Sequence, residues 1–178
     1  GSDSLETRRK GFRELLAALE QVRAAGNSGE ILLLTFGGGG QLAPASLPFR
    51  CLHLGPLRTP GEVALAYNAA SCLVLPSLED NLPNVALEAL ACGLPVAAFA
   101  TGGIVDMVDA AVGRLAPTGD TAALAAAVAQ LHGLPAPEMQ QMRLRCRQTA
   151  LARFTLLHQG RAYKTLYEDV LRARGQQV

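Results

Sequence analysis

The chain has 178 residues, a formal net charge of +1, five Phe, three Tyr and no Trp. It has no basic stripe, so it lacks the electrostatic footprint of a nucleic-acid-binding protein. Its four cysteines have no CxxC spacing, and no apolar run approaches the roughly 18 residues of a membrane span. We therefore expect a cytoplasmic protein without a zinc site, with residues 1–178 forming one domain or one half of a larger enzyme.

Predicted helices and strands alternate along the chain, which favours an α/β fold with a parallel sheet covered by helices on both faces. A first helix is predicted over about 8–25 and closed by Gly26. The run ILLLTF at 31–36 follows, and its continuous apolar character predicts a strand buried on both faces. Gly37–Gly40 come next, in a loop where backbone can approach a ligand, and Gly38 is a candidate contact.

The rest of the chain continues the alternation. Thr59 and Pro60 predict the N-cap and first residue of a helix, and Pro83 is expected at the first position of the helix 84–92. His53 lies within a short apolar strand and is interpreted as a core histidine. In chain order the predicted elements are strand 51–54, helix 60–70, strand 71–75, helix 84–92, strand 95–100, a turn near 104–108, an edge strand at 113–117, and helices 121–131, 138–152 and about 155–174.

The most informative segment is PSLEDNLPNVALEALACGLPVAAFATGG at 76–103. It places Asp80 and Glu88 on either side of a helix start, with seven residues between them. A helix N-terminus attracts phosphate through its unpaired N–H groups and its dipole. Ionised carboxylates only accept hydrogen bonds and therefore suit hydroxyl groups. The segment predicts a site for a diphosphate flanked by hydroxyls, as in a nucleotide sugar; the alternative is a surface helix with an acidic N-cap.

Four loops, at 37–40, 55–58, 76–82 and 101–103, each follow a predicted strand. Ligands of open parallel sheets bind outside the carboxyl ends of the strands. We therefore expect the four loops to gather at one rim of the molecule.

The extended segment PSLEDNLPNVALEALACGLPVAAFATGGIVDMV resembles the nucleotide-sugar-binding signature of GT-B retaining glycosyltransferases of group 1, the GT4 family. RRKGF, HLGPL and GRLAPTGD resemble further landmarks of that family. The resemblance implies the C-terminal, Rossmann-like half of a two-domain enzyme, with the helix 155–174 packing back toward an N-terminal acceptor domain outside this chain. It also implies transfer of a sugar from UDP- or GDP-sugar to an acceptor hydroxyl without a metal or other cofactor. Membrane contact would arise only through the full-length enzyme.

The same resemblance assigns roles to two carboxylates. Glu88 matches the residue that holds the ribose hydroxyls of the nucleotide. Asp80 falls where the family has a glutamate that contacts the donor sugar, so it is one methylene shorter. The adjacent Glu79 is the alternative for that role.

Lys10 matches the family lysine that pairs with the donor diphosphate, where an ammonium would stabilise the charge of the leaving oxygen. The alternative is a solvated cluster of Lys10 with Arg8 and Arg9. The family also has an arginine a few residues earlier, at the spacing of Leu5. Either that arginine lies upstream of this chain, or Arg8 or Arg9 replaces it.

The remaining candidate contacts with the donor lie in loops. A tight turn without a ligand is the alternative for the segment 101–103. Two other functions stay open, a non-catalytic module that binds sugar nucleotides and a nucleotide-sugar epimerase of the same architecture. The candidate residues are Asn81, Leu82 and Pro83 before the helix, Thr101, Gly102 and Gly103 after the fourth strand, and Leu57 and Arg58 beside the base.

Overall fold

The computed structural model describes residues 8–26, 31–38 and 50–174. Leu5 and the predicted loop positions 39–40 lie outside these residues. Among the described residues, the strands form two hydrogen-bonded parallel sheets. The first sheet pairs β1 (Leu32–Thr35) with β2 (Arg50–His53), and the second has the order β3 (Leu73–Leu75), β4 (Val96–Phe99), β5 (Gly113–Ala116). The predicted edge position of β5 is confirmed.

The helices follow the predicted order, with boundaries that shift by a few residues. A 3₁₀ turn at Arg8–Lys10 precedes the first helix. The helices are α1 (Phe12–Ala24), α2 (Pro60–Ala69), α3 (Asn84–Ala91), α4 (Ile104–Met107), α5 (Thr121–His132), α6 (Ala136–Arg153) and α7 (Leu156–Ala173).

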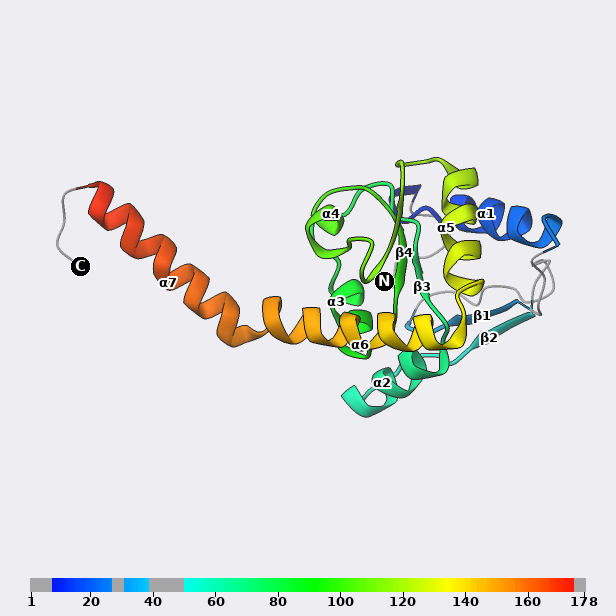
Figure 1. Cartoon of the computed structure of the whole chain (residues 1–178), viewed down its shortest axis with the longest axis horizontal. Coiled ribbons are helices and arrows are strands. Elements are labelled where there is room, and N and C mark those ends of the chain that lie inside the picture. Colours follow the sequence, from blue (N-terminus) through cyan, green and yellow to red (C-terminus); the bar gives the residue numbers. More distant parts are fainter. Residues whose placement is uncertain (1–7, 27–30, 39–49, 175–178) are drawn as a thin grey trace.

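The core surrounds β4, whose four residues are all buried. Figure 1 shows β3 and β4 between α3 on one side and α5 on the other, and α5 also packs against α1. Covering a parallel sheet on both faces is what its continuous apolar strands require. The largest fully buried side chains include Phe99, Leu90, Leu94, Ile104 and Met107.

Two features of the N-terminal part differ from the sequence predictions. The first helix does not begin at Arg8, because Gly11 adopts a left-handed conformation (φ 66°) and separates the 3₁₀ turn from α1. The strand β1 is not buried on both faces, since Leu32 is 51% exposed at the edge of a two-stranded sheet.

The prediction that His53 is a core residue was wrong. His53 is exposed on β2, and its Nδ1 lies 3.0 Å from the hydroxyl oxygen of Thr35 on the paired strand. The sequence pattern indicated burial because apolar residues flank His53, but β2 has a neighbour on one edge only within the described residues.

The helix caps follow local sequence closely. Thr59 caps α2 in a capping box, where its hydroxyl accepts from the Glu62 N–H (3.2 Å) and Glu62 accepts from the Thr59 N–H (3.0 Å). The N–H groups of Arg58 and Thr59 lower the pKa of Glu62. Pro83 is the N-cap of α3 and not its first residue, because its ψ of 112° is extended.

The helix α7 projects away from the rest of the chain (Figure 1) and has no buried residue. Tyr163, Leu166, Tyr167 and Val170 are between 43% and 65% exposed along it. Among the described helices, none is both long enough and apolar enough to cross a membrane.

Candidate functional site

The 3₁₀ turn at Arg8–Lys10 lies against the loop that follows β3. The Leu78 N–H donates to the Arg9 carbonyl at 2.8 Å, and Lys10 Nζ lies 3.0 Å from Asp80 Oδ2. The two side chains are 36% and 15% exposed, so the pair faces water and contributes little to stability. Lys10 is therefore directed to Asp80 and does not extend freely into solvent, while Glu79 is exposed.

The loops after β3 and β4 pack directly on one another. The Gly103 N–H donates to the Asn81 carbonyl at 2.7 Å. A Cβ on Gly102 would overlap the Asp80 carbonyl oxygen, and one on Gly103 would overlap that of Asn81. These glycines are thus required by contact between two loops, whereas the sequence suggested either contact with the donor or a tight turn without a ligand.

The other residues predicted in these loops have different surroundings. Thr101 donates its hydroxyl hydrogen bond to the Leu78 carbonyl at 3.1 Å, so the hydroxyl serves the contact between the loops. Asn81 and Leu82 are exposed, whereas Pro83, the N-cap of α3, is buried. Side chains or backbone groups of the exposed pair are accessible to a ligand at this rim.

Glu88 lies on an exposed position of α3 and accepts a hydrogen bond from the hydroxyl of Tyr67, at 2.9 Å from its Oε2. Tyr67 lies on α2, is 3% exposed, and meets the ring of Phe36 edge-on at 5.5 Å between centroids. Burial first, and then the hydrogen bond to Glu88, raise the pKa of Tyr67, so it stays a donor at neutral pH. Sequence reasoning missed Tyr67, because no local pattern links it to a residue 21 positions later.

Leu57 and Arg58 lie in the loop between β2 and α2. They line a pocket of about 540 Å³ together with Leu54 of the same loop and Leu65 of α2. The Gly37 N–H donates to the Gly55 carbonyl at 2.9 Å, which joins the loops after β1 and β2. Gly38 is exposed, and a Cβ there would meet no atom within 4 Å, so the structure shows no steric need for glycine at that position.

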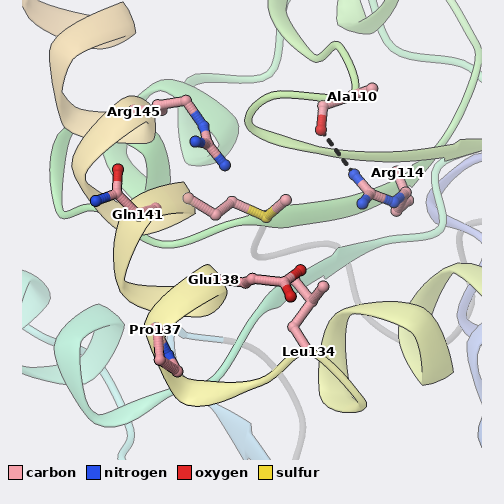
Figure 2. Close-up of a pocket in the computed structure, with 8 residues that line it drawn as sticks. Ala110, Arg114, Leu134, Pro137, Glu138, Gln141 and Arg145 are labelled. Atoms are coloured by element: carbon pink, nitrogen blue, oxygen red, sulfur yellow. Dashed lines mark hydrogen bonds between the residues drawn. The ribbon is translucent and has the colours of Figure 1, made fainter.

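A further pocket, of about 330 Å³, lies beside the amino end of β5. Figure 2 shows it between α6 and the segment entering β5, with Arg114 donating to the Ala110 carbonyl at 2.7 Å. Arg145 and Glu138 also line it. Neither Lys10 nor Asp80 lines this pocket. Open parallel sheets bind ligands at the carboxyl ends of their strands, so this pocket is not the candidate site.

The described residues offer little for metal or thiol chemistry. They contain no group of three His, Cys, Asp or Glu side chains that could hold a metal ion. The four cysteines are unpaired, and burial raises the pKa of Cys72 to about 11 and that of Cys146 to about 12. These two thiols are therefore protonated at neutral pH and behave as small apolar side chains.

A comparison with protein families shows which family the chain belongs to. A family model described as glycosyl transferases group 1 matches residues 3–133, which include every candidate residue of the site. The chain belongs to the group 1 glycosyl transferases. The resemblance carried by the segment 76–108 is thereby confirmed, and so is the α/β, Rossmann-like fold class.

Named relatives of this group 1 glycosyl transferase chain are glycosyltransferases. It is 33% identical over 161 residues to a D-inositol 3-phosphate glycosyltransferase of Segniliparus rotundus, covering 85% of this chain and 34% of the relative. The chain spans about a third of the length of the curated relatives it matches, at 36% and 34%.

Solved structures have the same fold. Sucrose-phosphate synthase from Thermosynechococcus elongatus matches with a TM-score of 0.70 and 29% identity, over 91% of this chain and 43% of that one. Anabaena HepE in complex with UDP-glucose matches with a TM-score of 0.71 and 19% identity, over 90% of this chain and 46% of that one. At that identity, the likeness to HepE establishes the fold alone.

Proposed function

We propose that this chain is the donor-binding domain of a retaining glycosyltransferase, which transfers a sugar from UDP- or GDP-sugar to an acceptor hydroxyl. The observation that carries the proposal is the meeting of Lys10 with Asp80 at the rim, next to the packed loops 76–82 and 101–103. Glu88 presents a carboxylate from the helix that starts there. A protein of the same fold has been solved with UDP and with UDP-glucose, which supports a nucleotide sugar as the ligand.

The chemistry follows from the charges. Breaking the bond between the sugar and the diphosphate develops negative charge on the leaving oxygen. In this proposal the Lys10 ammonium stabilises that charge, so the reaction needs no divalent metal. Asp80, 3.0 Å from that ammonium, accepts from sugar hydroxyls and keeps Lys10 at the rim until the donor arrives. Glu88 accepts from the ribose hydroxyls.

The acceptor site belongs, in this proposal, to an N-terminal domain outside the chain. The relatives are about three times longer than the segment matched. The apolar face of α7, with Tyr163, Leu166 and Tyr167 exposed, would pack toward that domain. The chain alone should therefore bind nucleotide weakly and turn over essentially nothing. The cytoplasmic location, and membrane contact through the full-length enzyme only, remain predictions.

The test is a calorimetric titration of the chain with UDP, GDP and ADP, without metal and again with magnesium. We expect metal-independent binding of one nucleoside diphosphate. Glu88→Ala should weaken it by about 1.5–3 kcal/mol, the scale of hydrogen bonds to a charged group. Lys10→Ala should also weaken it, because it removes the charge opposite the diphosphate.

A matched control is Lys164→Ala, which removes another lysine with a carboxylate partner. Lys164 is 77% exposed on α7 and lies 3.6 Å from Glu168, far along the chain from the rim. It should leave nucleotide affinity unchanged. Equal effects of Lys10→Ala and Lys164→Ala, or affinity that survives Glu88→Ala, would contradict the proposed site.

A non-catalytic module is the second candidate, and the observation that favours it is the shorter Asp80 in place of the family's glutamate. An assay of donor binding and sugar transfer by the full-length parent protein separates the two, with Asp80→Glu as the companion variant that restores the family's longer carboxylate. Sugar transfer by the parent protein establishes the enzyme, whereas a parent that binds donor without any turnover supports the module.

A further inference from the structure

The hydrogen bond between Tyr67 and Glu88 connects two helices that follow strands of different sheets. Tyr67 lies on α2, which follows β2, and Glu88 lies on α3, which follows β3. The hydroxyl is 2.9 Å from Glu88 Oε2, and the tyrosine ring is held by burial and by its T-shaped contact with Phe36. The donor is thus fixed in place, while its acceptor is an otherwise exposed side chain.

We propose that Tyr67 is a positioning residue, which holds the Glu88 carboxylate in the orientation that receives both ribose hydroxyls of the nucleotide. The inference rests on the proposed function, because it requires Glu88 to bind ribose. Tyr67 would affect the ligand only through Glu88.

The acceptor capacity of the carboxylate allows this role. An ionised carboxylate has two oxygens and about four lone-pair directions. Tyr67 occupies one direction on Oε2 and leaves Oε1 and the rest of Oε2 for two neighbouring hydroxyls. A cis diol presents two O–H groups to one carboxylate, so the three donors can be satisfied together.

The fixed orientation matters because Glu88 is exposed. A free glutamate on a helix surface samples several rotamers, and binding must select one of them at an entropic cost. Tyr67 makes that selection before the ligand arrives, which is preorganisation. A tyrosine that served packing alone would influence every ligand equally, whereas a positioning tyrosine acts only on ligands that carry the ribose hydroxyls.

The experiment compares UDP with its 2′,3′-dideoxy analogue, or the GDP pair if GDP is the better ligand, by NMR titration of the chain. In the parent chain, UDP should bind more tightly than the analogue. Tyr67→Phe keeps the ring and removes the hydroxyl. It should weaken UDP by about three- to tenfold, the scale of ordering one flexible side chain on binding. Affinity for the dideoxy analogue should stay within about twofold of the parent value.

A double-mutant cycle completes the test. In the Glu88→Ala background, Tyr67→Phe should have no further effect on UDP, because the carboxylate it positions is gone. Tyr163→Phe is the matched control, since it removes a hydroxyl from a 52% exposed tyrosine on α7 and should change neither ligand. Urea midpoints of all variants show whether the fold is intact.

The outcomes separate the two proposals. If the parent prefers UDP and Tyr67→Phe retains that preference in full, the positioning role is overturned and the proposed function stands. Equal weakening of both ligands by Tyr67→Phe would also overturn it, in favour of packing. A parent chain that binds no nucleoside diphosphate, or binds without preference for the ribose hydroxyls, overturns the role of Glu88 and the inference together.

Discussion

Gly11→Ala should destabilise the chain far more than an ordinary glycine substitution. Gly11 has φ 66°, and holding alanine in this left-handed region costs about 1 kcal/mol. The new Cβ would also overlap the Pro76 carbonyl oxygen and lie 2.7 Å from the carbonyl carbon, well inside the roughly 3.5 Å of normal contact.

Relief of that overlap requires the chain to move away from residues 76–78. The movement breaks the Leu78–Arg9 backbone hydrogen bond of 2.8 Å, worth about 1 kcal/mol. It also separates Lys10 from Asp80, an exposed pair worth at most about 1 kcal/mol. We therefore expect Gly11→Ala to lower the free energy of unfolding by about 2–3 kcal/mol, taking these terms together with the left-handed conformation.

Gly26→Ala provides the matched control. Gly26 has φ 72° at the other end of α1, but a Cβ added there would meet no atom within 4 Å. Gly26→Ala should lower the free energy of unfolding by only about 1 kcal/mol, the cost of holding alanine in the left-handed conformation. Urea denaturation followed by circular dichroism at the helix band measures both. If the two variants agree within about 0.5 kcal/mol, the reasoning from close contact with Pro76 is refuted.

Two further predictions concern α2. Thr59→Ala removes the hydroxyl that accepts from the Glu62 N–H and should lower the free energy of unfolding by about 1 kcal/mol in urea denaturation. The control Thr165→Ala removes an exposed threonine hydroxyl within α7 and should lower it by less. The raised pKa of Tyr67 predicts stability that is fully present below the unfolded tyrosine pKa of about 10 and is lost as the pH rises above it. Urea midpoints between about pH 8 and 11 should therefore fall more steeply for the parent than for Tyr67→Phe, and parallel curves would contradict this prediction.

Much of the fold could be predicted from local signals. Thr59 and Pro60 mark the start of α2, Thr155 caps α7, and Gly26 and Gly93 adopt positive φ just after α1 and α3. Each of these residues acts through its own backbone conformation or a hydrogen bond spanning three residues. Such effects depend on a few neighbouring residues, so they can be predicted without knowledge of the tertiary structure.

The failures arose where distant segments meet. RRKGF reads as the start of one helix, because nothing local reveals the Pro76 carbonyl that lies against Gly11. The exposure of Leu32 and His53 depends on which strands flank β1 and β2, and an apolar run does not contain that information. For the site, the segment 76–103 identified the acidic residues and the glycines, while Tyr67 required the geometry.

The contact between the loops after β3 and β4 has a consequence for engineering donor specificity. Gly102 and Gly103 fit against the carbonyls of Asp80 and Asn81, and Thr101 binds Leu78. The conformation of each loop therefore depends on contacts with the other, so a relative's loop cannot replace one of them alone. A chimera that transplants residues 76–83 alone would set foreign backbone against these glycines and should express poorly. The two segments, 76–83 and 101–103, should be exchanged together.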